Sequence, residues 1–147
     1  MDVINLQMKT KAMPGKVDAY WYEDESANLK RTLFHRVTIP LVPFDSGMAD
    51  DKQPHTTEMV FDWYNLNLGD VSDLDGLNLR HRDYEEAEGD VVIGGAHNWC
   101  DVKRLEFEKT APGVFNVSGE LIVEFESEDL GSNEVFEFET TVQYVPS

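Results

Sequence analysis

The chain has 147 residues, of which 41% are hydrophobic and 11% aromatic, and its formal net charge is -17. This length fits one domain with a core of its own, and the hydrophobic content excludes a disordered chain. The charge is uneven: residues 1–44 hold six Lys or Arg and five Asp or Glu, whereas residues 45–147 hold six and 24. A field of this sign attracts basic proteins and argues against direct binding to nucleic acid or to an anionic membrane.

Cysteine usage and hydropathy bear on the compartment. The single cysteine, Cys100, cannot form an internal disulfide, and the first residues lack the apolar stretch of a secretory signal. No apolar run approaches the length of a membrane span. These features favour a cytoplasmic protein.

Four strands are expected in the first half of the chain. Alternation of apolar and polar residues predicts strands over residues 3–10, 17–22 and 31–42, and prolines end the third strand or place it at a sheet edge. Residues 44–57 have little apolar content and are expected to form an exposed loop. Residues 58–68 change alternation phase after Trp63, which predicts a bulged strand, with a short helix over residues 57–65 as the alternative.

The second half contains the longest alternating pattern. Residues 69–90 show no clear period, and short strands are expected over residues 91–95 and 99–109, with a bulge near Lys103. Residues 114–145 predict a long β-hairpin that is aromatic on its inner face and acidic on its outer face. The inner set is Phe115, Val117, Gly119, Leu121, Val123, Phe125, Phe136, Phe138, Thr140, Val142 and Tyr144.

The outer face of this hairpin brings glutamates together. If the inner and outer residues are to stay on their own faces, the numbers of any two residues paired across the hairpin must add to an odd value. A sum of 261, for example, places Glu124 opposite Glu137. Every such register crowds glutamates, and like charges directly opposite are destabilising. Arg104 and Lys103 on the preceding strand are expected to reach Glu120 or Glu124 and to offset part of this repulsion.

Taken together, these patterns predict an all-β, mainly antiparallel fold over residues 1–147. We expect a single-domain β-sandwich or flattened barrel of about eight strands, with at most one or two short helical turns.

Two short motifs suggest metal sites but lack ligands. His97 and Cys100 could both ligate Zn²⁺, yet the chain has no second cysteine, and side chains three apart on a strand point to opposite faces. The stretch 70–76 partly matches a calcium loop but places Arg82 where a bidentate Glu is required, so only a looser cation site stays open. We therefore expect no catalytic set, no metal and no cofactor.

Charge is the feature that exceeds what folding needs. It predicts a non-enzymatic acidic binding or inhibitor protein that docks a basic protein partner, in an immunity-like or charge-mimic role. The alternative is a carbohydrate- or small-ligand-binding protein that uses exposed aromatics from residues 20–22, Trp63, Tyr64 or Trp99. A homo-oligomer is compatible with both. The predicted partner-binding residues are Glu120, Glu124, Glu126, Glu128, Asp129, Glu137 and Glu139, with the acidic stretch 83–90 as a second patch.

Overall fold

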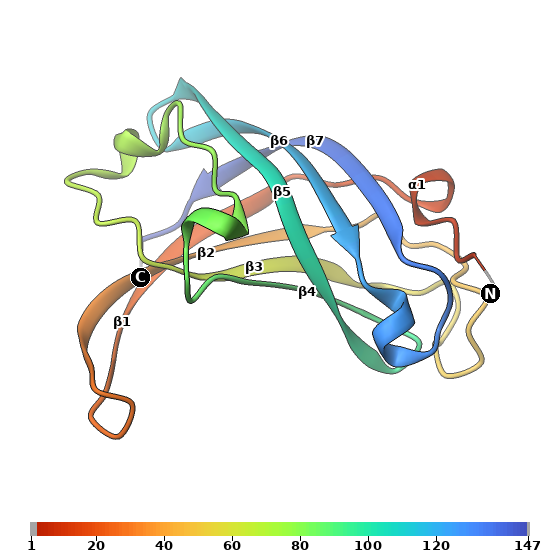
Figure 1. Cartoon of the computed structure of the whole chain (residues 1–147). Coiled ribbons are helices and arrows are strands. Elements are labelled where there is room, and N and C mark those ends of the chain that lie inside the picture. Colours follow the sequence, from red (N-terminus) through yellow and green to blue (C-terminus); the bar gives the residue numbers. More distant parts are fainter. Residues whose placement is uncertain (1–2, 147) are drawn as a thin grey trace.

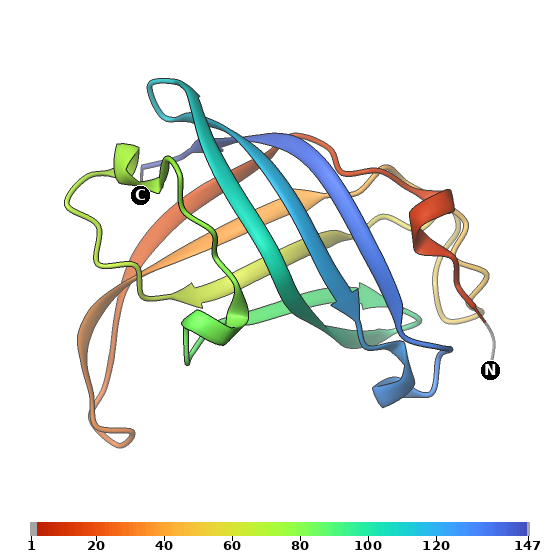
Figure 2. The ribbon, with the colours of Figure 1, turned by 45° about the horizontal axis from the view of Figure 1, so that its top comes forward.

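The computed structural model describes residues 3–146, in which seven strands close into one barrel (Figures 1 and 2). Neighbouring strands are antiparallel except β1 and β7, which are parallel and pair only over Gly15–Val17 and Val142–Tyr144. The all-β class is confirmed, in its barrel form and with one parallel pair. The strands are β1 (Gly15–Asp24), β2 (Leu29–Pro40), β3 (Glu58–Tyr64), β4 (Glu88–Ile93), β5 (Ala96–Ala111), β6 (Val114–Val123) and β7 (Glu134–Tyr144).

Four short helical turns accompany the barrel in residues 3–146. They are the α-helical turn α1 (Leu6–Lys9) and the 3₁₀ turns η1 (Val71–Leu74), η2 (His81–Asp83) and η3 (Phe125–Glu128).

The turn α1 replaces the strand predicted over residues 3–10, and that prediction is wrong. The Glu134 carboxylate accepts hydrogen bonds from the backbone N–H groups of Asn5 and Leu6, at 2.8 and 2.7 Å. The Gln7 side-chain amide donates to the backbone carbonyl of Glu137 and accepts from its N–H. These bonds hold the turn against β7, where β1 does not pair.

Inward-facing side chains fill the barrel. The predicted inner face of β6 and β7 is confirmed for its apolar residues from Phe115 to Val142, which are buried. Gly119 lies opposite Phe138, whose ring stacks on Phe61 with 6.3 Å between ring centroids. Because the interior is occupied by this packing, candidate binding surfaces lie on the outer wall and at the barrel ends.

Both predicted bulges are present. Trp63 adopts a φ of 63°, and the register between β2 and β3 shifts beside it, so Trp63 leaves the inner face and Tyr64 becomes buried. This strand excludes the helix considered for residues 57–65. A second register shift separates Val102 from Arg104, as expected for a bulge at Lys103.

The two ends of the barrel carry different loops. The loop over residues 41–57 lies at the same end as α1 and η3, whereas the β1–β2 hairpin extends beyond the opposite end in both views (Figures 1 and 2). Within residues 3–146, no helix has the length and hydrophobicity needed to cross a membrane.

Candidate functional site

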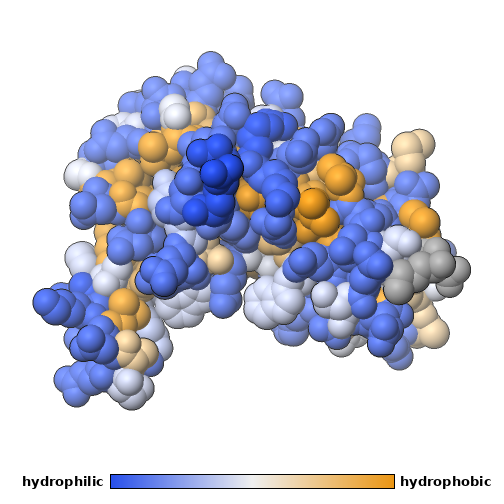
Figure 3. All heavy atoms as spheres, in the orientation of Figure 1, coloured by the Kyte–Doolittle hydropathy of each residue, from blue (hydrophilic) through white to orange (hydrophobic). Residues whose placement is uncertain are grey.

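Among the glutamates on the outer wall of β5, β6 and β7, four lie in two neighbouring rows of the sheet. We call these four the acidic wall: Glu106, Glu120, Glu137 and Glu139. Glu120 on β6 lies directly opposite Glu137 on β7, and Ser118 lies between Glu106 and Glu139 in the adjacent row. Paired residue numbers add to 257, an odd value as predicted, but Glu120 rather than Glu124 faces Glu137. The face of the molecule shown in Figure 3 is mostly hydrophilic, with small apolar patches.

The basic residues next to the acidic wall bind elsewhere. Arg104 lies opposite Glu120 in the register, but its Nη1 donates to Ser118 Oγ at 2.6 Å. Lys103 forms an ion pair with Asp101 at 2.7 Å. The expectation that these two cations form ion pairs with Glu120 or Glu124 is therefore wrong. Arg104 keeps its positive charge beside the wall, but four glutamates outnumber it and the wall stays net negative.

The other predicted partner-binding residues lie apart from the wall. Glu124 follows β6 and lines a hollow of about 350 Å³ that also contains His81 and Asp101. Glu126 exchanges hydrogen bonds with Asn133 across the connection between β6 and β7, through its backbone N–H and its carboxylate. Glu128 and Asp129 are exposed in that same connection. The structure thus brings together three of the seven predicted residues.

Glu106 belongs to the acidic wall but is absent from the predicted set. Its strand was recognisable from the alternation of Leu105 and Phe107, which face inward and are buried. The outward position of Glu106 follows from that same alternation. Glu106 could have been predicted by assuming that the outer face of the hairpin continues onto the preceding strand.

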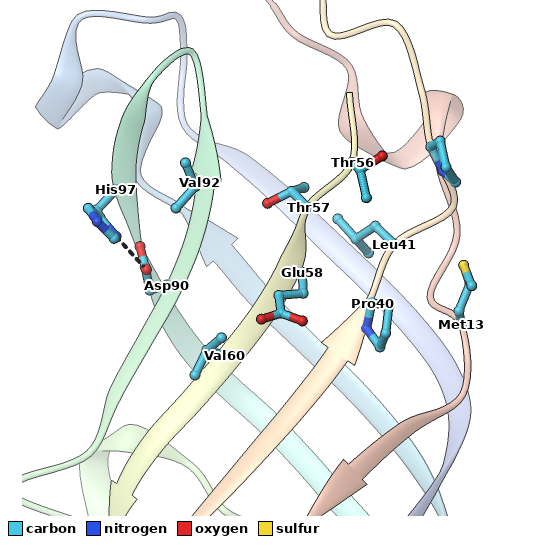
Figure 4. Close-up of a pocket in the computed structure, with 11 residues that line it drawn as sticks. Met13, Pro40, Leu41, Thr56, Thr57, Glu58, Val60, Asp90, Val92 and His97 are labelled. Carbon is cyan, nitrogen blue, oxygen red and sulfur yellow. Dashed lines mark hydrogen bonds and ion pairs between the residues drawn. The ribbon is translucent and has the colours of Figure 1, made fainter. Parts of the chain in front are cut away.

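A second surface is a hollow of about 550 Å³ on the outer wall of β2 to β5, which we call the β2–β5 groove (Figure 4). Its apolar lining consists of Met13, Pro40, Leu41, Pro43, Val60 and Val92. Its polar lining consists of Thr56, Thr57, Glu58, Asp90 and His97. Apart from Leu41, which is buried in the core, the strand residues that line it face outward.

Hydrogen bonds fix the polar side of the β2–β5 groove. His97 Nδ1 lies 2.7 Å from Asp90 Oδ2, and this hydrogen bond raises the pKa of His97. The other carboxylate oxygen, Asp90 Oδ1, is buried and has no hydrogen-bond partner among the described residues. His55 Nε2 lies 2.8 Å from the Val92 carbonyl oxygen and ties the 41–57 loop to β4 beside the groove.

The structure gives each of the two suggested metal motifs another arrangement. His97 points outward, whereas Cys100 is buried in the core, and burial raises the pKa of its thiol. Asp70 and Asp73 form a capping box at η1, in which each carboxylate accepts a backbone N–H. Across residues 3–146, no three His, Cys, Asp or Glu side chains are placed to hold a metal ion together.

Exposed aromatic side chains gather near the projecting hairpin. Trp21 is 57% exposed, and the guanidinium of Arg31 lies 4.5 Å from its ring centroid. Both residues line a hollow of about 440 Å³ together with Asn65 and Asn67. Trp63 instead packs edge-on against neighbouring aromatic rings outside the barrel.

The fold and its surfaces define a small closed β-barrel with an acidic outer wall. Comparison of the chain with known protein families, with curated proteins and with solved structures finds no match. The acidic wall, the β2–β5 groove and the hollow beside Trp21 are therefore the surfaces from which a function can be argued.

Proposed function

We propose that this protein is a non-enzymatic binding protein that docks a basic protein partner through the acidic wall. The observation that supports it best is the direct opposition of Glu120 and Glu137, neither of which forms an ion pair within residues 3–146. Like charges in this position destabilise a sheet. Lys103 is paired with Asp101, and the single charge of Arg104 cannot balance the four glutamates of the wall. A basic partner surface supplies the missing counter-charge.

The ion pairs among the described residues also leave the wall glutamates without partners. Among residues 3–146, every ion pair uses an aspartate and none uses a glutamate. The glutamate charge of the wall is therefore free to act on another molecule. Clefts and faces of one sign raise association rates by about 10- to 1000-fold through steering. An inhibitor or charge-mimic role in the cytoplasm fits such a surface.

Charge reversal tests this proposal. The variant E120K/E137K changes the wall by four charge units, and E23K/E25K makes the same change on the exposed β1–β2 hairpin. Each purified protein is used to capture partners from an extract of the native host, and captured proteins are identified by mass spectrometry. The expected result is a basic protein retained by the wild type and by the hairpin variant but lost with the wall variant.

Kinetics give the second readout. With the captured partner in hand, association through the wall should slow by about tenfold or more in the E120K/E137K variant and should also slow as salt is added. Equal association rates for the wall and hairpin variants would exclude the acidic wall as the docking surface. Unfolding curves of both variants check that the fold is intact.

A second candidate function is saccharide binding at the end of the barrel that carries the hairpin. It is supported by the exposed Trp21 ring, which lies in one hollow with the carboxamide side chains of Asn65 and Asn67. Indole rings stack on sugars and carboxamides bond to hydroxyl groups. A glycan array tests it: W21A should abolish specific binding, whereas W99A, which removes another exposed indole from the barrel wall, should not.

A further inference from the structure

The β2–β5 groove has a composition that the docking proposal does not use. Its lining joins an apolar floor to two carboxylates, and the residues that line it include no Lys or Arg. In Figure 4 the Glu58 carboxylate lies between the His97–Asp90 pair and Pro40, with Val60 beside it. An apolar hollow with a few polar groups at defined positions is typical of small-molecule sites, which range from about 300 to 1000 Å³.

Asp90 lacks one hydrogen-bond donor. His97 occupies Oδ2, but Oδ1 is buried without a partner among the described residues. Most buried polar atoms in folded proteins are hydrogen-bonded, so an unpaired one calls for a donor. A cationic donor suits it best, because hydrogen bonds between ionised groups are stronger than neutral ones.

Glu58 adds a second negative group to the same hollow. It forms no ion pair in the structure and is exposed at the start of β3. An ammonium group carries three N–H donors and can therefore serve Asp90 and Glu58 together. Val60 and Val92 lie beside these carboxylates and offer apolar contact to whatever carries the ammonium group.

We propose that the β2–β5 groove binds an organic ammonium ion with an aliphatic body. The ammonium group donates to Asp90 and Glu58, and the alkyl chain lies on Val60, Val92 and Pro40. An anionic amphiphile is repelled by the two carboxylates, and a neutral one leaves Glu58 without a counter-charge and Asp90 Oδ1 without a charged donor. The site is distinct from the acidic wall and does not depend on docking of a protein partner.

Three probes that share one alkyl chain test the proposal. Hexylammonium, 1-hexanol and hexanoate are titrated separately into the ¹⁵N- and methyl-labelled protein at constant ionic strength, and chemical shifts are followed by NMR. Hexylammonium should give saturable shifts at Val60, Val92 and Thr57, with 1-hexanol weaker and hexanoate silent. Equal affinity for hexylammonium and 1-hexanol, or no saturable shift in the groove, would overturn the proposal.

Charge-neutral variants assign the effect to the two carboxylates. D90N and E58Q should each weaken hexylammonium binding by about fivefold, as expected for loss of one charge contact near water, and leave 1-hexanol unchanged. The matched control is E88Q, which removes the outward carboxylate two residues before Asp90 on β4. If D90N and E58Q keep the preference for the ammonium probe, the proposal is wrong. Such a failure leaves the acidic wall untouched, because the wall is tested on other residues.

Discussion

Gly119 offers the sharpest test of how tightly the barrel interior is packed. A Cβ atom added there would lie 2.4 Å from Phe138 Cε1 and 2.5 Å from Cζ. The Phe138 ring is 8% exposed and stacks on both Phe61 and Phe136, so it has little room to withdraw. Overpacking costs about 1–3 kcal/mol, whereas the lower backbone entropy of alanine returns roughly 0.5–1 kcal/mol. We expect G119A to lower the free energy of unfolding by about 1–2 kcal/mol.

Urea denaturation followed by circular dichroism and tryptophan fluorescence measures this change. The control is G69A, the same substitution in a loop where the nearest atom, Asp73 Oδ2, is 3.5 Å away and no clash arises. The variant F138L makes room for the new methyl group, so G119A/F138L should be more stable than the two single effects predict, by about 0.5 kcal/mol or more. A neutral G119A, or strictly additive effects, would show that the interior is looser than described.

Three further predictions concern charge, protonation and reactivity. E137Q should raise stability by about 0.2–1 kcal/mol in low salt by relieving Glu120, and the gain should shrink in 1 M salt in parallel denaturation curves. Burial lowers the pKa of His35 below 6.5, so on acidification the unfolded chain takes up a proton before the folded protein does. Stability should therefore be full above pH 6.5 and fall below it, by about 1.4 kcal/mol for each pH unit between the two pKa values. The fall should be less steep in H35Q. Cys100 is 2% exposed and burial raises its pKa, so a thiol reagent should modify it only as fast as the protein unfolds, and rapid labelling of the native protein would contradict its burial.

Alternation predicted the inner faces of the strands well because burial imposes a period of two on every packed strand. The same pattern misled over residues 3–10. Ile4 and Leu6 are buried as expected, but Met8 is 80% exposed, since the chain turns into α1 there. The groups that stabilise this turn, Glu134 and the backbone of Glu137, lie 128–130 residues away in the sequence. A local pattern contains no information about such contacts.

Register explains why Glu124 lies off the acidic wall although it was predicted there. Alternation determines only whether paired numbers add to an odd or an even value, because a slip of two residues leaves every side chain on its own face. In the observed register, paired residue numbers add to 257. This register places Phe138 over Gly119, and β6 ends at Val123. That register pairs Glu120 with Glu137 and moves Glu124 off the wall. The sequence therefore predicts that paired residue numbers add to an odd value, but which odd value is adopted depends on how side chains pack in three dimensions.

The two proposed surfaces both select cations, and salt distinguishes them. The acidic wall acts through a field between exposed charges, which salt screens with a Debye length of about 10 Å at 0.1 M and about 3 Å at 1 M. In the β2–β5 groove much of the attraction comes from apolar contact with Val60 and Val92, which salt does not screen. Raising the salt from low to molar concentration should therefore slow docking of a basic protein while the groove continues to prefer hexylammonium over methylammonium. If salt abolished both effects equally, the groove would be acting only as part of the general negative field, and its apolar lining would have no role in recognition.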